Sequence, residues 1–315
     1  MSTEKTKDDV LVVKNLKQYF RVDKKHTVKA VDDVSFSIKR GSTFALVGES
    51  GSGKSTIGKS LIRLYDPTEG SILLDGTEIA GPMTKEKKRF LTGRMQMIFQ
   101  DPIASLNPRM TVREIIAEGL VINGIRDKEY IDEKVYEILE MVGLVREHAG
   151  RYPHEFSGGQ RQRIGIARSV IMRPDLLIAD EPISALDVSI QAQVINLLND
   201  LRDKLGLTIL FIAHDLSVVK YFSDRIGVMY FGNMVELASS DELFAHPLHP
   251  YTRSLLSAIP LPDPDAEKNR VRITYNPIAE HDYTVDKPSM REVVPGHFVY
   301  CNDAEEARYR EELGK

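Results

Sequence analysis

The fold of this 315-residue chain is decided by the stretch Thr43–Ser55, TFALVGESGSGKS. Its first part, Thr43–Val47, is short and apolar, as is typical of a strand that is buried on both faces. The glycines that follow allow backbone N–H groups to curve around phosphate oxygens. A helical pattern then begins, and its N-terminus adds the positive end of the helix dipole. The stretch therefore predicts a loop that binds a nucleoside triphosphate.

The predicted roles within this loop follow from residue type. Lys54 would reach the β- and γ-phosphates, and the Ser55 hydroxyl would bind Mg²⁺. A flexible glycine–serine turn is the alternative, but the strand before the loop and the helix after it favour phosphate binding. The expected nucleotide-binding residues are Gly48, Glu49, Ser50, Gly51, Ser52, Gly53, Lys54, Ser55 and Thr56.

Acidic residues follow a second apolar run. Leu176–Ala179 predicts a buried strand that leads directly into Asp180 and Glu181. Ligands in open α/β sheets bind at the carboxyl ends of the strands. Asp180 is thus expected to hold Mg²⁺, directly or through water, and Glu181 is the candidate general base for the attacking water. Helix capping is the alternative role, but it does not account for a phosphate loop on a partner strand.

A histidine closes a third buried run. His214 follows Thr208–Ala213, and at the end of a strand it could contact a γ-phosphate. A lone histidine is more often structural, so only its place beside the other two strand ends supports this role.

The remaining pattern predicts an α/β protein with a mostly parallel sheet, because strands and helices alternate. Short strands at Val10–Val13, Val34–Ile38 and Ile72–Leu74, the last followed by an Asp-Gly turn, predict an antiparallel layer. A second hairpin is expected from Ile226–Phe231 and Met234–Ala238. Helical spacing is predicted for three sets of residues: Ile57, Leu61, Leu64 and Tyr65; Ile115, Ile116, Val135, Ile138, Leu139 and Val142; and Val188, Ala192, Ile195, Leu198 and Leu201.

The order of these segments suggests the domain organisation. Helical spacing over about residues 108–172 predicts a helical subdomain inserted between the parallel strands. Three prolines within residues 260–264 predict a boundary, after which the tail ends in a charged helix at Ala304–Glu312.

Composition excludes several classes of protein. The net charge of −4 argues against a bulk electrostatic nucleic-acid binder. The longest strictly apolar run, Ile209–Ala213, is far too short to cross a bilayer, and the polar N-terminus does not resemble a secretory signal. The single cysteine, Cys301, excludes an internal disulfide and fits a reducing compartment. These features predict a soluble, cytoplasmic protein.

A short segment resembles a known family. Phe156–Gln160, FSGGQ, resembles the LSGGQ signature of ABC-transporter ATPases, with Phe in place of Leu. The other family elements occur in the family's order: the phosphate loop, Gln100 as in the Q-loop, Asp180-Glu181, Ser184–Asp187 as in the D-loop, and His214 as the switch histidine.

The resemblance covers about residues 10–255 and implies the RecA-like core of a P-loop NTPase. It implies a nucleotide-binding domain over 10–255, with a helical subdomain at about 101–172, and a C-terminal extension over 256–315. ATP and Mg²⁺ are the implied cofactors, with Ser55, Gln100 and Asp180 at the metal. The implied catalytic residues are Lys54, Gln100, Glu181 and His214, and Gln100 would sense either Mg²⁺ or the attacking water. Phe20 is implied to stack on adenine; the alternative is that it serves only in core packing.

The signature has a physical interpretation as well. Ser157 can cap a helix over Gly158–Met172 and leave its N-terminal amides free for an anion. In the family, Ser157, Gly158, Gly159 and Gln160 would face the γ-phosphate held by the opposite subunit, so a second ABC ATPase is implied.

The C-terminal half narrows the resemblance. The segments His246–Thr252 and Leu255–Pro260 resemble oligopeptide, dipeptide and nickel importer ATPases. Three further segments together look most like the F-type ATPase of oligopeptide permeases: Arg151–Ser157, Asp286–Met290 and Pro295–Val299. The implied function is an ATP-hydrolysing peptide translocase subunit at the cytoplasmic face of the membrane. Its implied partners are a D-type ATPase, two transmembrane permease subunits and, indirectly, an extracytoplasmic peptide-binding protein. A dipeptide or nickel importer and a non-transport ABC ATPase are the alternatives.

One departure from the family bears on cofactors. Many relatives carry a cysteine-rich iron–sulfur motif in the extension, whereas this chain has only Cys301. No cluster is therefore predicted, and no nucleic-acid partner. The prolines beside His246 and His249 argue against a metal site there as well.

Overall fold

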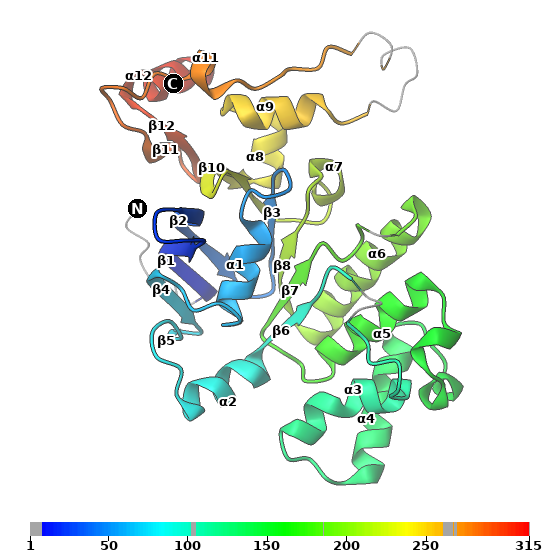
Figure 1. Cartoon of the computed structure of the whole chain (residues 1–315). Coiled ribbons are helices and arrows are strands. Elements are labelled where there is room, and N and C mark those ends of the chain that lie inside the picture. The colour runs from blue at the N-terminus through cyan, green and yellow to red at the C-terminus, as the bar shows by residue number, and fades with distance from the viewer. Residues whose placement is uncertain (1–7, 102–104, 185, 261–266, 268–269, 315) are drawn as a thin grey trace.

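The computed structural model describes residues 8–101, 105–184, 186–260, 267 and 270–314, and within them the chain forms two sheets (Figure 1). The main sheet has the strand order β11-β12-β10-β9-β3-β8-β7-β6. Its strands are β3 (Thr43–Val47), β6 (Met95–Ile98), β7 (Leu176–Asp180), β8 (Thr208–Ile212), β9 (Arg225–Tyr230), β10 (Asn233–Ser239), β11 (Ser289–Val294) and β12 (His297–Cys301). The strands from β9 to β6 are parallel, as alternating strands and helices predict.

The strand before the phosphate loop lies in the middle of this sheet. β3 pairs with β9 on one side and with β8 on the other, and all five of its residues are buried. Phe44 and Leu46 face the core shared with the antiparallel sheet, whereas Ala45 and Val47 face the core beneath the helices. This double burial explains the continuous apolar run in the sequence.

The predicted antiparallel layer is present. Its strands are β1 (Asp9–Arg21), β2 (Thr27–Lys39), β4 (Glu69–Leu74) and β5 (Thr77–Glu78), in the order β2-β1-β4-β5. Val34, Phe36 and Ile38 point into the core as their alternation predicts. Asp75 and Gly76 form the tight turn between β4 and β5, both with positive φ.

Helices occupy the interval between β6 and β7. They are α3 (Val112–Ile122), α4 (Lys128–Met141) and α5 (Gly158–Val170), with short 3₁₀ turns at Arg146–Gly150 and Pro153–Glu155, and α2 (Lys85–Arg94) precedes β6. The six apolar residues predicted for this region are all buried. In Figure 1 these helices lie at the opposite end of the molecule from the C-terminal helices.

Two helical faces differ from the sequence prediction. α1 (Lys54–Leu61) ends before Leu64 and Tyr65, because Arg63 adopts a left-handed φ of 61°, and Leu64 is 58% exposed. In α6 (Val188–Leu205) the packed face runs through Ile190, Val194, Leu198 and Leu201. Val188 and Ala192 are two positions out of phase with that face, about 200° around the helix, and are exposed.

The C-terminal residues continue the main sheet. β12 pairs with β10 and β11 pairs with β12, both antiparallel. The helices of this half are α7 (Leu216–Val219), α8 (Ser240–Ala245), α9 (Pro250–Ser257), α11 (Pro277–Glu280) and α12 (Asp303–Glu312). The expected boundary at 255/256 falls inside α9, and most of the proline-rich segment proposed as a boundary, residues 261–264, lies outside the described residues, as does Met1–Lys7 of the N-terminal arm.

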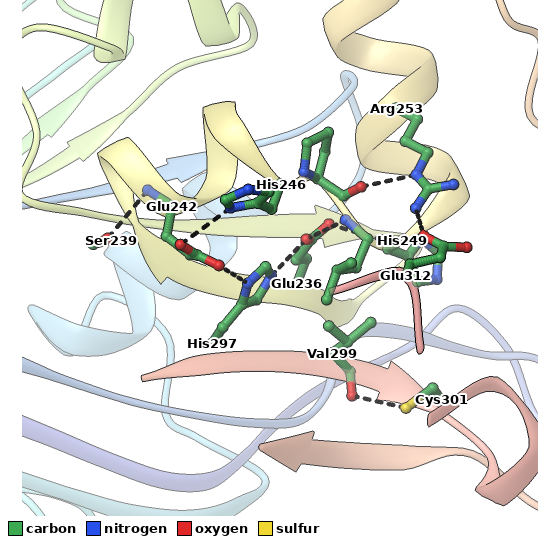
Figure 2. Close-up of polar contacts among 12 residues, drawn as sticks. Glu236, Ser239, Glu242, His246, His249, Arg253, His297, Val299, Cys301 and Glu312 are labelled. Carbon is green, nitrogen blue, oxygen red and sulfur yellow. Dashed lines mark hydrogen bonds and ion pairs between the residues drawn. The ribbon is translucent and has the colours of Figure 1, made fainter. Parts of the chain in front are cut away.

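A buried polar cluster joins β12 to the rest of the chain (Figure 2). His297 Nε2 lies 2.8 Å from Glu236 Oε1 of β10, and its Nδ1 lies 3.3 Å from Glu242 Oε1 of α8. The other oxygen of Glu242 lies 3.4 Å from His246. Two histidine–carboxylate contacts of His297 thus fasten the tail to β10 and to α8.

Among the helices that the structure describes, none has the length and apolar character needed to cross a membrane.

Candidate nucleotide site

Several of the predicted site residues converge where β3, β7 and β8 end. A cavity of about 290 Å³ opens there. It is lined by Ala30, Ser50, Gly51, Gly53, Lys54, Ser55, Thr56, Gln100, Glu181 and His214. Parallel strands bring their carboxyl ends to one edge of the sheet, so three segments far apart in the sequence meet at one place.

The phosphate loop is shaped by its glycines. Gly48 has a φ of 145°, and a Cβ there would lie 2.2 Å from the Met229 carbonyl oxygen. Gly53 has a φ of 105°, and a Cβ there would lie 2.2 Å from the Ala30 carbonyl oxygen. Both positions thus combine a left-handed backbone with direct contact to a neighbouring chain segment, which only glycine permits.

Lys54 is folded over its own loop. Its Nζ donates to the carbonyl oxygens of Gly48 at 2.7 Å and Glu49 at 2.8 Å. Burial lowers the pKa of Lys54, and the negative charges of Glu181, Asp180 and Glu49 oppose that shift. The ammonium is held at the mouth of the loop, where phosphate oxygens can take over its hydrogen bonds.

Ser55 and Asp180 form the candidate magnesium site. Ser55 Oγ donates to Asp180 Oδ1 at 2.7 Å. Burial raises the pKa of Asp180, although the Ser55 hydrogen bond and the charges of Lys59 and Lys54 oppose this. A hydroxyl, a carboxylate and the nearby Gln100 amide supply the hard oxygen donors that Mg²⁺ prefers, so these residues fit that ion.

Glu181 connects the remaining polar residues. Gln100 Nε2 donates to Glu181 Oε2 at 2.8 Å, and His214 Nδ1 lies 3.8 Å from the same oxygen. Glu181 has a left-handed φ of 45°, and its N–H donates to the Ile212 carbonyl of β8. The strained backbone at the end of β7 is therefore pinned to the neighbouring strand, which aims the carboxylate into the cavity.

The signature segment forms the predicted helix start. Ser157 Oγ accepts from Gln160 N, and Gln160 Oε1 accepts from Ser157 N, which completes a capping box at α5. The helix ends at Val170, two residues earlier than expected. The residues that line the nucleotide cavity include none of Ser157, Gly158, Gly159 and Gln160.

Phe20 is also absent from the lining of that cavity. Its ring packs edge-on against Tyr65 with 5.1 Å between centroids. Its predicted stacking on adenine therefore stays a prediction. Of the D-loop, Ser184 donates to the Glu181 carbonyl, and Ala185 lies outside the described residues.

Some contacts to the loop were not predicted, and two of them come from elements far from the site motifs. Ala30 of β2 lies against Gly53, and Tyr251 of α9 contacts Glu49. No local pattern in the sequence marks either residue, because each contact depends on how distant elements pack.

Family models match most of this architecture. Residues 31–184 match the ABC transporter model, and residues 235–285 match the oligopeptide/dipeptide transporter C-terminal region. Among solved structures, CbiO1 of Clostridium perfringens, part of an ABC transporter complex, superposes with a TM-score of 0.67 at 28% identity over 76% of this chain and 91% of that chain. An ATP-binding cassette bound to ADP and Pi as a dimer gives 0.66 at 28% identity, over 73% and 98%.

The fold and the site define the class: the chain belongs to the ATP-binding proteins of ABC transporters, and it is an ABC ATPase that binds ATP.

Its similarity extends along nearly the whole chain to peptide-transport members of the class. The oligopeptide transport ATP-binding protein OppF of Bacillus subtilis is 61% identical over 95% of this chain and 98% of its own length. AmiF of Streptococcus pneumoniae, also an oligopeptide transport ATP-binding protein, is 55% identical over 97% and 99%. The dipeptide transport ATP-binding protein DppF of Lactococcus lactis is 53% identical over 96% of each chain. The chain is thus a member of the oligopeptide and dipeptide branch of the ABC ATPases.

Proposed function

We propose that this chain is the ATP-hydrolysing, energy-coupling subunit of an importer for oligopeptides. The cavity that joins Lys54 and Ser55 of the phosphate loop to Glu181, which follows β7, carries the proposal for ATP hydrolysis. The oligopeptide names of the 61% and 55% identical relatives carry the proposal for the substrate. One relative at 53% identity is a dipeptide transport protein, so dipeptides are the second candidate substrate.

In the proposed mechanism, the phosphate loop binds ATP, and Glu181, which follows β7, accepts the proton. The loop amides and Lys54 would bind the phosphates. Ser55, Asp180 and Gln100 would hold Mg²⁺, which would neutralise charge on the phosphate oxygens. Glu181 accepts a proton from the water that attacks the γ-phosphorus. As the new P–O bond forms, the bond to the bridging oxygen of ADP breaks, and His214 beside Glu181 contacts the γ-phosphate.

The site is proposed to be completed by a second cassette. Ser157 to Gln160 would bind the γ-phosphate of the opposite subunit through the free amides at the start of α5. The separation of this segment from the chain's own cavity supports that arrangement. A D-type ATPase is the proposed partner.

The membrane partners are proposed to dock on the helical subdomain. A second cavity, of about 690 Å³, lies between α2–β6 and α3–α5 and reaches Gln100 and Asp180. Its rim includes Ile122, which is 71% exposed. We propose that a cytoplasmic loop of one of two permease subunits docks there, with the chain at the cytoplasmic face of the membrane. An extracytoplasmic binding protein would deliver the peptide. The proposed nucleotide-binding domain spans 10–255, with the extension over 256–315.

The test separates binding from hydrolysis with two variants. Glu181→Gln should still bind ATP while hydrolysis falls by about 10²–10³-fold and peptide uptake is lost, because only the proton acceptor is removed. Lys54→Ala should lose ATP binding itself. Near-normal turnover in Glu181→Gln would refute the proposed base, and normal uptake of peptides in a strain lacking the chain would refute the transport function.

A further inference from the structure

One hydrogen bond joins the C-terminal region to the phosphate loop. The backbone N–H of Glu49 donates to the Tyr251 hydroxyl at 3.0 Å, although the two residues are 202 positions apart. Tyr251 belongs to α9 and is 2% exposed. It lies within residues 235–285, which match the oligopeptide/dipeptide transporter C-terminal region. A residue outside the ATPase motifs therefore touches the loop that carries them.

The position of Tyr251 is fixed at its backbone. His249 Nδ1 accepts from Tyr251 N at 3.1 Å and so caps α9. The N–H groups of Leu248 and His249 donate to the two carboxylate oxygens of Glu236, which also contacts His297 (Figure 2). The start of α9 is thereby tied both to β10 and to β12.

The ring of Tyr251 is fixed as well. It packs against Tyr230 with 4.5 Å between ring centroids and against Tyr275 with 5.5 Å. Burial raises the pKa of Tyr251 to about 12, so its hydroxyl stays protonated and neutral at physiological pH. The hydroxyl oxygen is thus a fixed, neutral acceptor for the loop.

The Tyr251 hydroxyl and the Lys54 ammonium form hydrogen bonds with the same peptide unit. That unit consists of the Gly48 carbonyl and the Glu49 N–H. Tyr251 holds its N–H, and Lys54 Nζ donates to its carbonyl oxygen. Because the peptide is planar, fixing the N–H direction also fixes the carbonyl that anchors the lysine ammonium. Gly48 itself is wedged against the Met229 carbonyl, next to Tyr230.

We propose that Tyr251 is a positioning residue of the nucleotide site, whose hydroxyl orients the Gly48–Glu49 peptide and thereby preorganises the loop and Lys54 for ATP. The proposal rests on the proposed ATP-binding function of this loop. It gives the C-terminal region a direct part in ATP affinity. A loop that lacks this anchor must be ordered by the nucleotide itself, at a cost in affinity.

The test is Tyr251→Phe, which keeps the ring and its packing and removes only the acceptor. The matched control is Tyr275→Phe, in the same aromatic cluster but not the partner of the Glu49 amide. Full-length chains are titrated with a non-hydrolysable ATP analogue and Mg²⁺, and the assembled transporter is assayed for kcat and KM. Tyr251→Phe should weaken binding and raise KM for ATP by about two- to tenfold, the size expected for one lost hydrogen bond, with kcat within about twofold.

The alternatives give different results. A merely structural role would lower the melting temperature and the amount of active protein, and hence kcat, with KM unchanged, and that result overturns the proposal. Equal affinities for wild type and Tyr251→Phe overturn it too, as does an equal loss of affinity in Tyr275→Phe. Failure of the wild-type chain to bind the analogue would instead refute the proposed function.

Discussion

Gly48 leaves no room for a side chain, so its substitution tests the loop geometry directly. Gly48→Ala would bring a Cβ to 2.2 Å from the Met229 carbonyl oxygen, and backbone on both sides would have to move. We expect ATP binding to be lost and the free energy of unfolding to fall by about 2 kcal/mol or more, as for other strained backbone positions. Equilibrium urea unfolding and ATP titration provide the two measurements.

Gly51→Ala is the matched control in the same loop. Gly51 also has a positive φ, +82°, but a Cβ there meets nothing within 4 Å. Its cost should be limited to backbone strain, about 1–2 kcal/mol. If Gly48→Ala were as well tolerated as Gly51→Ala, the close approach to Met229 would be wrong.

Cys301 offers a second test at the residue scale, because it is the chain's only cysteine. It is fully buried in β12, and burial raises its pKa to about 12, so the reactive thiolate is scarce at pH 8. Alkylation should be slow in the native protein and fast in urea. Rapid alkylation of native protein would contradict this burial, and stoichiometric iron and sulfide in the purified protein would contradict the predicted lack of a cluster.

At the scale of elements, the sequence pattern predicted those features that depend on neighbouring residues in the chain, such as a buried strand and a tight turn. Double burial made Thr43–Val47 continuously apolar, and the Asp75-Gly76 pair supplied the left-handed turn between β4 and β5. Where one strand ends beside another, as at Glu181 and His214, the rule for parallel sheets was enough to bring the residues together.

The rest depended on tertiary packing. The phase of α6 could not be read from the sequence, because Val188 and Ala192 fit a helical stripe as well as Ile190 and Val194 do. The pairing of β12 with β10 and the contact of Tyr251 with Glu49 join residues about 60 and 202 positions apart. Neither leaves a periodic signal in one sequence.

The start of α9 should respond to acid. Burial, together with the nearby charges of His281 and Arg253, lowers the pKa of His249 to about 3 from an ordinary value of 6.5. The unfolded chain therefore binds a proton that the folded chain does not, and stability is lost as pH falls from about 6.5 toward 3. The slope from this one group is at most about 1.4 kcal/mol per pH unit.

His249→Asn isolates that slope. Asparagine keeps a side-chain acceptor at the helix N-cap but does not titrate. The stability difference between wild type and variant, from urea unfolding at pH 7 and pH 5, should shift by about 2 kcal/mol in favour of the variant at pH 5. A pH-independent difference would show that His249 takes up its proton equally well in the folded and unfolded chains, which contradicts the lowered pKa.

For the molecule as a whole, the main sheet connects three parts of the structure. One end carries the helical subdomain, the middle carries the nucleotide cavity, and the other end carries β12 and β11. Among the described residues, a small separate core joins the tail to the loop before α9; it is formed by Leu248, Val293, Val299, Cys301 and Tyr309. The pairing of β12 with β10 and the contacts of His297 with Glu236 and Glu242 help to attach the tail to the rest of the chain.

This attachment should weaken with alkali. Burial works to lower the pKa of His297, but the hydrogen bonds and charges of Glu236 and Glu242 outweigh it, so the pKa is raised above 6.5. A raised pKa means that the folded chain holds a proton more tightly than the unfolded chain. The contribution is fully present below about pH 6.5 and is lost as pH rises through the raised pKa. Over this alkaline range, the stability advantage of wild type over His297→Gln should shrink, as measured by urea unfolding between pH 6 and 9.

His246→Gln is the control, because His246 contacts the same Glu242 from an exposed position. An equal shrinkage for His246→Gln would trace the effect to Glu242 rather than to the buried pair of His297 and Glu236. A wild-type advantage over His297→Gln that stays constant to pH 9 would mean that the charged pair does not hold the tail.

Because β12 and Tyr251 are both tied to Glu236, loss of the His297 proton should also raise the KM for ATP in wild type and not in His297→Gln. The KM measurement tests whether a change in the attachment of the tail alters ATP binding at the nucleotide site.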